Sequence, residues 1–423
     1  MYGNISLPGD KSISHRAAMI AAMAVGETKI DNFATSADCW STVACLEKLG
    51  VQIDRHVNKL VVHGVGKLGF TPPTEPLDCG NSGTTMRLLS GIMAGQNFQS
   101  VMIGDESLQG RPMKRVIAPL TKMGAVIDSN EGMAPLTITG KSPLNAIEYQ
   151  SPVASAQIKS CVLLAGLNSN GKTSVIEPVQ TRDHTERMLR WFGVDVTVAE
   201  TDAGSRISVS GDATLAANDF IVPSDISSAA FFMVAAACLD GSDVTLPNVG
   251  FNASRTAIFQ VLESLGANVS VESLDEVCNE PVSSLRIRGG IANTGTSANL
   301  VNGSTIANII DEIPILAIFG TQIEGGLEIR DAAELRVKES DRIATVVENL
   351  RRMGASVEEF PDGFKVDRSQ LTGAVIDSFG DHRIAMAFGI AGLLADGETE
   401  IVGAESANVS FPGFFETLKS VVS

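Results

Sequence analysis

Residues 8–16 read Pro-Gly-Asp-Lys-Ser-Ile-Ser-His-Arg and place a lysine, a serine and an arginine close together. If a helix begins near Ser12, then Ser12 and Arg16 share one helical face, and Lys11 shares a face with His15. The unpaired N–H groups and the positive dipole end of such a helix attract anions such as phosphate or carboxylate. The segment therefore predicts an oxyanion-binding site.

Four other short segments repeat this chemistry, each combining arginine with glycine or polar residues. They are GNSGTTMR at 80–87, GRPMKR at 110–115, LRVKESDR at 335–342 and GDHR at 380–383. Arginine suits this task because its planar guanidinium stays protonated and matches carboxylate and phosphate oxygens. We therefore expect several anionic groups to be bound together.

The composition restricts the kind of ligand. The 423 residues carry a formal net charge of −17, which disfavours nucleic acid or an anionic membrane as a partner. The basic segments stand out against that acidic background and suit small anionic ligands. The longest apolar run, residues 229–239, is too short to span a bilayer.

The six cysteines are scattered, with no C-x-x-C pair and no histidine at zinc-site spacing. This pattern predicts no metal site and a reduced compartment. We expect a cytoplasmic protein, and a monomer because the repeats described next need no partner chain.

A short pattern recurs along the chain and predicts a repeated α/β unit. It combines leucine, an apolar residue three positions later and then glycine, as in LEKLGV (46–51), LTKMGA (120–125), LRWFGV (189–194), LESLGA (262–267) and LRRMGA (350–355). Each reads as a helix that ends in a left-handed glycine cap and is followed by a strand. The C-terminal LKSV resembles a truncated sixth copy. Two domains of three units each, divided near residues 223–225, are the simplest arrangement for a chain of this length.

Two further helices, within residues 17–24 and 227–239, are apolar on nearly every side, so we expect them to be buried.

Two nucleotide-binding formulas occur by chance. Residues 166–173 match G-x-x-x-x-G-K-[ST], but a helical pattern precedes them and a strand-like run follows, the reverse of a P-loop. Residues 64–69 match G-x-G-x-x-G, but Pro72, Pro73 and Pro76 exclude the helix that must follow. We interpret both as ordinary turns.

Eight blocks, taken in order, resemble the 5-enolpyruvylshikimate-3-phosphate synthase family. They are PGDKSISHR (8–16), GNSGTTMR (80–87), GRP (110–112), SAQIKS (155–160), TRDHTE (181–186), IDEIP (310–314), LRVKESDR (335–342) and GDHRIAM (380–386). The resemblance covers nearly the whole chain. It implies transfer of the enolpyruvyl group of phosphoenolpyruvate to the 5-hydroxyl of shikimate 3-phosphate, with release of phosphate and without a metal or organic cofactor.

The resemblance also implies a fold, namely the two-domain, inverse α/β barrel-like fold of enolpyruvyl transferases with six α/β units, three per domain. Residues 10–223 would form one domain and residues 1–9 with 224–423 the other, with the active site in the cleft between them.

The resemblance assigns the site residue by residue. For shikimate 3-phosphate it implies Lys11, Ser12, Arg16, Ser155, Ala156, Gln157, Arg182, Asp311 and Lys338. For phosphoenolpyruvate it implies Lys11, Asn81, Gly83, Thr84, Arg111, Gln157, Arg342 and Arg383. The catalytic residues would be Asp311, Glu339, Lys11 and His382. We further expect a helical turn from Lys338 to Arg342 that places both cations on one face.

Three positions differ from some family members. His184 stands where some have tyrosine, Glu334 where some have asparagine, and Glu405 where some have a lysine that contacts phosphoenolpyruvate.

Two other functions stay open. A sister enzyme transfers the same group to UDP-N-acetylglucosamine, but it normally has a cysteine where this chain has Glu106, ahead of Arg111. A non-catalytic anion-binding protein is the other alternative, and the intact Lys11, Asp311 and Glu339 argue against it.

Overall fold

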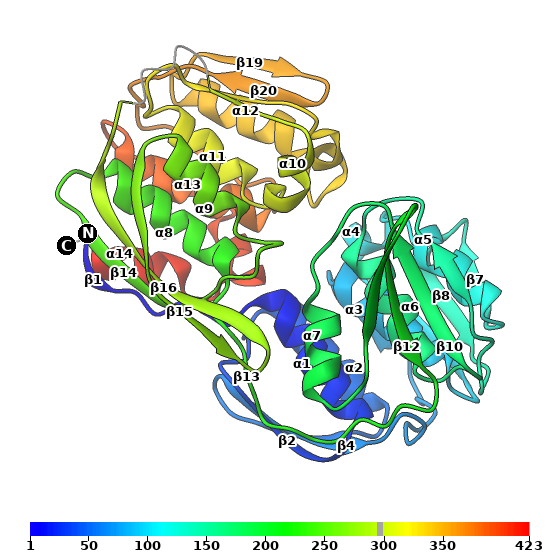
Figure 1. Cartoon of the computed structure of the whole chain (residues 1–423). Helices are drawn as coiled ribbons and strands as arrows, with labels where there is room; N and C mark the ends of the chain where they lie inside the picture. The colour runs from blue at the N-terminus through cyan, green and yellow to red at the C-terminus, as the bar shows by residue number, and fades with distance from the viewer. Residues whose placement is uncertain (294–298, 423) are drawn as a thin grey trace. The chain divides into compact units, whose positions relative to one another are not determined.

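The structure is a computed structural model that describes residues 1–293 and 299–422 (Figure 1). The chain divides into two compact units. The N-terminal unit comprises Gly9–Val222 with Val277–Glu280, and the C-terminal unit comprises Met1–Pro8, Pro223–Glu276 and Pro281–Ser423. The predicted boundaries lie at 9/10 and 223/224, and whether each unit acts as a functional domain stays a prediction.

Six sheets are formed by the described residues, three in each unit, and five of them share one topology. In those five, an edge strand runs parallel to its neighbour, that neighbour runs antiparallel to the third strand, and a fourth strand completes the sheet. This repetition confirms the repeated α/β unit that the sequence predicts.

In the N-terminal unit the sheets are, in spatial order, β13 (Phe220–Ile221), β2 (Val25–Asp31), β4 (Lys59–Val65) and β3 (Gln52–Arg55); β5 (Leu77–Asp78), β6 (Gln99–Ile103), β8 (Met133–Thr139) and β7 (Val126–Asn130); and β9 (Glu148–Gln150), β10 (Lys172–Glu177), β12 (Gly204–Ser210) and β11 (Thr197–Thr201).

In the C-terminal unit they are β1 (Tyr2–Asn4), β14 (Asp243–Gly250), β16 (Glu280–Ile291) and β15 (Ala267–Val277); β17 (Leu300–Val301), β18 (Leu327–Ile329), β20 (Gly363–Val366) and β19 (Val357–Phe360); and the two-stranded sheet of β21 (Val375–Asp377) and β22 (Glu400–Val402).

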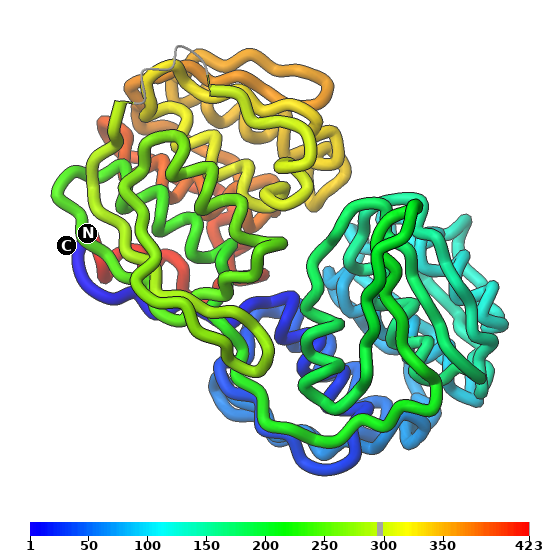
Figure 2. The backbone as a smooth tube through the Cα atoms, viewed as in Figure 1, coloured from blue at the N-terminus to red at the C-terminus, as the bar shows by residue number. Residues whose placement is uncertain are grey.

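Two short edge strands show how the chain passes between the units. β1, at the N-terminus, pairs with β14 of the C-terminal unit, where the blue start of the chain lies in Figure 2. β13 pairs with β2 and completes the first sheet of the N-terminal unit. The chain therefore enters the N-terminal unit directly before α1 and leaves it directly after β13.

Six inner helices form the cores of the two units. They are α1 (Lys11–Met23), α3 (Gly83–Ala94) and α6 (Ala156–Gly166) in the N-terminal unit, and α8 (Ile226–Cys238), α11 (Ile313–Gly320) and α13 (His382–Leu394) in the C-terminal unit. α3 packs against α1 and α6, and α8, α11 and α13 pack against one another (Figure 1). The predicted burial of residues 17–24 and of most of 227–239 is confirmed, since these residues lie in α1 and α8 with almost no exposed surface.

Six further helices lie outside these cores, and most of them are amphipathic. They are α2 (Ala37–Lys48), α5 (Lys114–Lys122), α7 (His184–Trp191), α9 (Ala257–Ser264), α12 (Arg342–Arg352) and α14 (Phe414–Val421). Short α4 (Glu106–Gln109) and α10 (Ser304–Ile309) and the 3-10 helices η1 (Ala333–Val337) and η2 (Ala404–Val409) complete the described helices.

The recurring leucine–glycine pattern marks the ends of the outer helices, as predicted. Its five glycines, Gly50, Gly124, Gly193, Gly266 and Gly354, all have a positive φ, and each lies two residues after the last residue of a helix. The strands β3, β7, β11, β15 and β19 follow them. The pattern therefore encodes the same left-handed helix cap in five of the six repeats.

Both nucleotide-binding formulas fall in turns, as predicted. In residues 166–173, the helix α6 comes first and the strand β10 begins at Lys172. After residues 64–69, the next described helix is α3, which begins at Gly83. Neither segment has the strand-to-helix geometry that holds a nucleotide phosphate.

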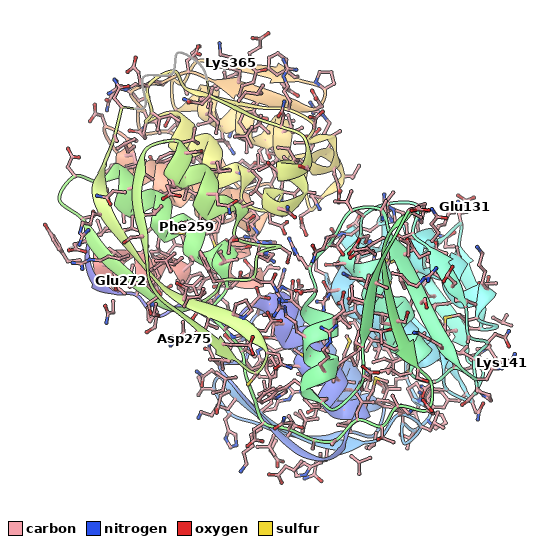
Figure 3. All side chains as sticks on the ribbon, viewed as in Figure 1. Glu131, Lys141, Phe259, Glu272, Asp275 and Lys365 are labelled. Carbon is pink, nitrogen blue, oxygen red and sulfur yellow. The ribbon has the colours of Figure 1, made fainter. Side chains whose placement is uncertain are left out.

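Charged side chains cover the outer surface of both units. Glu131 and Lys141 in the N-terminal unit and Glu272 and Asp275 in the C-terminal unit are exposed and point away from the ribbon (Figure 3).

Gly193 provides a test of the helix cap. Its φ is +87° and an added Cβ would meet no atom within 4 Å, so Gly193→Ala imposes backbone strain without a steric clash. We expect the unfolding free energy to fall by roughly 1 kcal/mol, measured by urea unfolding monitored by circular dichroism. Gly171→Ala is the matched control because its added Cβ would make only an ordinary contact with Ala146. Equal unfolding midpoints for the two variants would contradict the cap assignment.

Candidate active site

The residues predicted for the site gather at the N-terminal ends of the inner helices. Lys11 and Ser12 open α1, Gly83 and Thr84 open α3, and Ala156 opens α6. The N-cap side chains of Asp10, Ser82 and Ser155 each accept a hydrogen bond from a backbone N–H of the first turn. These helix ends combine positive dipoles with nearby cations, which favours anions.

Arg16 is a buried cation in this region. Its guanidinium donates to the Ser12 carbonyl oxygen at 2.8 Å, to Thr185 Oγ1 at 2.8 Å and to Ser160 Oγ at 2.9 Å. No ion pair within 4 Å joins it to a carboxylate of the described chain. Burial lowers the pKa of Arg16 to about 10; the negative charges of Glu186 and Asp10 oppose this shift, and the positive charge of Arg182 adds to it. Two cations close together, one of them desolvated, create a strong preference for an anion here.

Lys11 is the second cation at the start of α1. Its ammonium forms a 2.9 Å ion pair with Asp38, and the two side chains are 20% and 10% exposed. Asp38 lies in the first turn of α2, so this pair fixes Lys11 at the junction of the two helices.

A hydrogen-bonded cluster joins the starts of α3 and α6 to Arg111. Arg111 donates to Asn81 Oδ1 at 2.7 Å, Gln157 donates to Thr84 Oγ1 at 3.1 Å, and Arg87 donates to Gln157 Oε1 at 2.8 Å. The structure thus brings together five of the residues predicted for phosphoenolpyruvate: Asn81, Gly83, Thr84, Arg111 and Gln157.

Arg87 belongs to this cluster although the sequence analysis does not assign it to a ligand. An added Cβ on Gly83 would lie 2.8 Å from one guanidinium nitrogen of Arg87 and 3.8 Å from one of Arg111. Two arginines therefore flank the glycine that opens α3. The sequence could have indicated this position, because Arg87 lies four residues after Gly83 and hence one helical turn away.

His15 is structural, although it stands in the first basic segment. Its Nδ1 lies 2.6 Å from Thr42 Oγ1, which in turn lies 2.6 Å from Thr85 Oγ1. Thr85 also donates to Ser82 Oγ at 2.8 Å, so a chain of buried hydroxyls ties α1, α2 and α3 together. Burial lowers the pKa of His15 to about 3, so the imidazole is neutral in the folded protein near pH 7.

Two groups of buried polar side chains near α7 escape prediction from sequence. Lys159, 1% exposed, lies 2.9 Å from Glu177 and 2.7 Å from Glu186. His184 Nδ1 lies 2.8 Å from Glu280 Oε1, and both side chains are 2% exposed. Glu280 comes from residues 277–280, far away in sequence, which explains why the partner of His184 was not predictable.

In the C-terminal unit, the candidate site residues surround Arg342. Its side chain is 2% exposed and has carboxylates on several sides. Its guanidinium lies 2.8 Å from Asp381, 2.7 Å from Glu339 and 3.5 Å from Asp311. Burial alone would lower its pKa, but Asp381 and Glu339 outweigh burial and raise it above the ordinary value. The structure therefore brings together both predicted catalytic carboxylates and the predicted arginine.

Asp381 holds Arg342 in place and was not assigned by the sequence analysis. It is fully buried, accepts a hydrogen bond from Ser340 Oγ at 3.1 Å and caps α13 by accepting from the Arg383 backbone N–H at 2.8 Å. Burial opposes its ionisation, yet Arg342 and His382 lower its pKa below the ordinary value. His382 and Arg383, both predicted site residues, open α13 beside it and are buried.

The predicted helical turn from Lys338 to Arg342 is wrong. Residues 338–341 are not helical, and α12 begins only at Arg342. Asp341 caps that helix by accepting from the Ala344 N–H at 3.0 Å, so the segment before it remains extended or bent. Lys338, predicted to bind shikimate 3-phosphate, pairs with Glu334 at 3.0 Å.

A second buried network lies next to Asp311 in sequence. Arg255, 4% exposed, lies 3.6 Å from Glu312 and 3.8 Å from Asp225, and it donates to Ser227 Oγ at 2.5 Å. Ser227 also donates to Glu312. The network ties the starts of α8 and α11 together and so anchors the segment that carries Asp311.

The predicted catalytic residues come from both units. Lys11 belongs to the N-terminal unit, whereas Asp311, Glu339 and His382 belong to the C-terminal unit. Within residues 1–293 and 299–422, no three histidine, cysteine, aspartate or glutamate side chains are grouped to hold a metal ion. None of the described helices is long and apolar enough to cross a membrane.

Within each unit, basic side chains gather at or near helix N-termini, an arrangement that favours small ligands carrying several anionic groups. Comparison with known proteins gives the family. A model described as EPSP synthase (3-phosphoshikimate 1-carboxyvinyltransferase) matches residues 1–418.

Curated relatives agree with that match. A 3-phosphoshikimate 1-carboxyvinyltransferase of Pelotomaculum thermopropionicum is 52% identical over 426 residues, covering 100% of this chain and 97% of the relative. One of Solibacter usitatus is 49% identical over 421 residues, covering 99% and 97%. A solved structure of EPSP synthase from Acinetobacter baumannii superimposes with a TM-score of 0.89 at 42% identity, covering 99% of this chain and 95% of that one. The chain belongs to the EPSP synthase family.

Family membership confirms the predicted fold class, a two-domain α/β fold built from repeats. It also confirms the predicted enzyme class, a transferase of the shikimate pathway and aromatic amino acid biosynthesis. Glu106, the residue on which the sequence disfavours the sister enzyme, opens α4.

The buried neutral His15 predicts a pH dependence of stability. In the unfolded chain a histidine takes up a proton near pH 6.5, but in the folded protein His15 does so only near pH 3. The contribution of the neutral His15 to the unfolding free energy is therefore complete above about pH 6.5. As the pH falls toward 3, the unfolding free energy decreases by about 1.4 kcal/mol per pH unit.

His15→Asn removes this titration, so the parent should lose about 2 kcal/mol more unfolding free energy than the variant between pH 6.5 and 5. Urea unfolding at several pH values measures it, with exposed His56→Asn as the control. Parallel pH profiles for parent and His15→Asn would refute the buried neutral state.

The Asp381→Asn variant tests whether the buried ion pair between Asp381 and Arg342 stabilises the protein. The variant keeps the shape but removes the closest fully buried countercharge, so we expect the unfolding free energy to fall by about 3 kcal/mol. Ser340→Ala, which removes only one hydrogen bond to Asp381, should lower it by about 1 kcal/mol. Urea unfolding measures both, and an Asp381→Asn variant as stable as the parent would show that the pair does not hold this site together.

Proposed function

We propose that this chain transfers the enolpyruvyl group of phosphoenolpyruvate to the 5-hydroxyl of shikimate 3-phosphate and releases phosphate. The observation that carries the proposal is the concentration of arginine, lysine and carboxylate side chains at or near the N-termini of the inner helices and of α12, in a protein whose net charge is −17. Two phosphates and a carboxylate are the kind of charges that such a set of cations binds.

Shikimate 3-phosphate is assigned to residues at the starts of α1 and α6 and to three further positions. These residues are Lys11, Ser12, Arg16, Ser155, Ala156, Gln157, Arg182, Asp311 and Lys338. The electrostatic support comes from Arg16, a desolvated cation with no carboxylate within 4 Å in the described chain and with Arg182 nearby. A phosphate bound there would be attracted by both guanidinium groups.

Phosphoenolpyruvate is assigned to the start of α3 and to arginines on both units. These residues are Lys11, Asn81, Gly83, Thr84, Arg111, Gln157, Arg342 and Arg383. We add Arg87, because it donates to Gln157 and its guanidinium, like that of Arg111, lies close to Gly83. The missing side chain at Gly83 lets the Arg87 guanidinium approach the start of α3, where an added Cβ would lie only 2.8 Å from it.

The reaction needs an acid and a base at one reacting centre. A proton is added to the methylene carbon of phosphoenolpyruvate, and the 5-hydroxyl loses its proton as its oxygen attacks the adjacent carbon. The resulting tetrahedral intermediate then loses a methyl proton and phosphate, which restores the double bond. Arginine and lysine donors stabilise the departing phosphate.

Asp311 and Glu339 supply the acid and base groups in this proposal. Both lie against Arg342, at 3.5 Å and 2.7 Å, and both are 23% exposed, so they can reach a ligand. We assign Asp311 to the 5-hydroxyl and Glu339 to the methylene carbon. Lys11 and His382 are the further proton-transfer candidates.

A phosphate-release assay tests the function and separates the alternatives. The protein should release phosphate from phosphoenolpyruvate only when shikimate 3-phosphate is present. Release with UDP-N-acetylglucosamine instead would indicate the sister activity. Binding of both shikimate-pathway substrates without release would indicate a non-catalytic protein.

The division of proton work is tested by isosteric amide variants. Asp311→Asn and Glu339→Gln should each lower turnover by roughly 10² to 10⁴ while shikimate 3-phosphate still binds, because only acid–base capacity is removed. Glu339→Gln should also slow exchange of the methylene protons of phosphoenolpyruvate with solvent, measured by NMR. If Glu339→Gln turned over at the rate of the parent, Glu339 would not be the acid that protonates the methylene carbon, and Lys11 would become the leading candidate.

We also propose that the protein is a monomer in the cytoplasm. The repeats complete their cores within one chain, and the six cysteines are unpaired. Sedimentation equilibrium should give a mass near 44.4 kDa.

A further inference from the structure

The sixth sheet differs from the other five. In those five sheets, the strand next to the parallel edge strand also pairs with a third strand on its other side. β22 holds the equivalent position in the sixth sheet, but among the described strands it pairs only with β21. No described strand lies along the other edge of β22. This corner of the C-terminal unit therefore lacks the two strands that extend the sheet in the other repeats.

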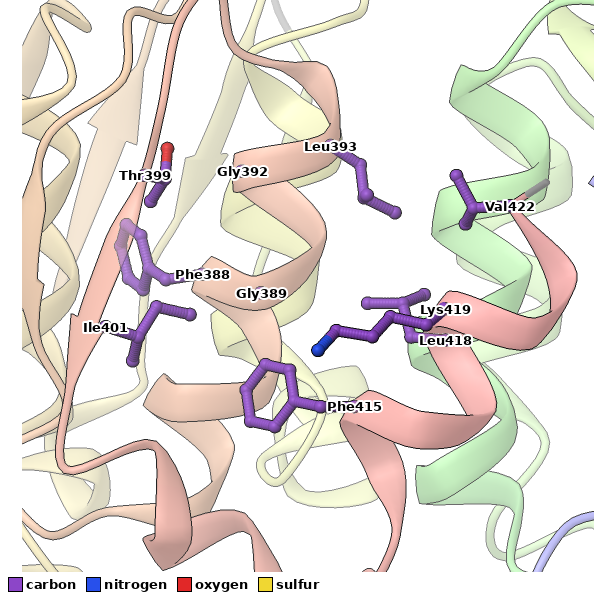
Figure 4. Close-up of a pocket in the computed structure, with 10 residues that line it drawn as sticks. All are labelled: Phe388, Gly389, Gly392, Leu393, Thr399, Ile401, Phe415, Leu418, Lys419 and Val422. Carbon is purple, nitrogen blue, oxygen red and sulfur yellow. The ribbon is translucent and has the colours of Figure 1, made fainter.

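A pocket of about 490 Å³ opens at this corner, between α13, β22 and α14 (Figure 4). Its walls include Phe388 and Leu393 from α13, Ile401 from β22 and Phe415 from α14. The volume lies within the range of small-molecule sites, and walls of this kind suit an apolar body. None of the lining residues belongs to the candidate active site.

Two polar groups interrupt the apolar lining. Lys419 is the one charged residue of the lining, and its ammonium has no hydrogen-bond or ion-pair partner within residues 1–293 and 299–422. Figure 4 shows its side chain extending along the pocket toward Phe415 and Gly389. The Thr399 hydroxyl is buried at the opposite wall and also has no hydrogen-bond partner in the described structure. An apolar pocket with one unpaired cation is complementary to an apolar anion.

We propose that this pocket binds a small amphipathic carboxylate. The apolar body of the ligand lies against Phe388, Leu393 and Phe415, and its carboxylate pairs with the Lys419 ammonium. An amine with the same apolar body is excluded, because its charge meets Lys419 with the same sign. Binding weakens with added salt, since the cation lies at an exposed position.

Titration of the full-length protein with octanoate, followed by NMR or calorimetry, tests the proposal. We expect saturable binding at one site, at least five-fold weaker for Lys419→Met and nearly unchanged for Lys419→Arg. Lys141→Met, at an exposed lysine of the N-terminal unit, is the matched control and should bind like the parent. Octylamine should bind at least five-fold more weakly than octanoate, and 3-phenylpropionate shows whether a flat aromatic body is preferred.

A second variant tests the pocket without changing its charge. Leu393→Trp adds bulk to the apolar wall and should also abolish octanoate binding, while the melting temperature shows whether the variant folds. Absence of octanoate binding to the parent would overturn the proposal. So would binding that neither Lys419→Met nor a folded Leu393→Trp variant reduces, because the ligand would then lie elsewhere.

Discussion

The burial of the six inner helices is the constraint on which the rest of the structure depends. Of the 13 residues of α1, 11 are buried, and α8 is buried even more completely. A helix surrounded by protein on every side can present functional groups only at its ends. The N-terminal ends also carry unpaired N–H groups and a positive dipole, so the packing that stabilises each unit creates its anion-binding positions.

Burial also decides how the charges behave. Arg16 and Arg342 are both almost fully buried, but their hydrogen-bond and ion-pair partners differ. Arg16 is held by hydroxyl and carbonyl oxygens, which leave its charge uncompensated at short range. Arg342 has three carboxylates around it, and its charge lowers the pKa of the buried Asp381. The first arrangement suits binding of an anion, and the second suits acid–base chemistry beside a cation.

Local signals predicted much of the fold. The leucine–glycine pattern predicted five helix ends because a left-handed cap depends on a few neighbouring residues, and the apolar composition of α1 and α8 predicted their burial. The same locality explains the one helical turn that was wrong. Spacing alone suggested a turn at 338–342, but the competing N-cap at Asp341 decided where α12 begins.

Partners distant in sequence were not predictable in this way. Asp381 and Arg342 are separated by 39 residues and His184 and Glu280 by 96, so no spacing rule relates them. The motif blocks identified the family because they contain the residues that make such long-range contacts, but the blocks do not show which residues are partners. The roles of the individual site residues stay predictions.

A crystal structure of the protein with shikimate 3-phosphate tests the central claim most directly, namely that the inner-helix N-termini form the anion sites. The account predicts the ligand phosphate within hydrogen-bond distance of Ser155 at the start of α6 and close to Arg182 and Arg16. A phosphate bound away from every inner-helix N-terminus, for example at the 166–173 turn, would contradict it.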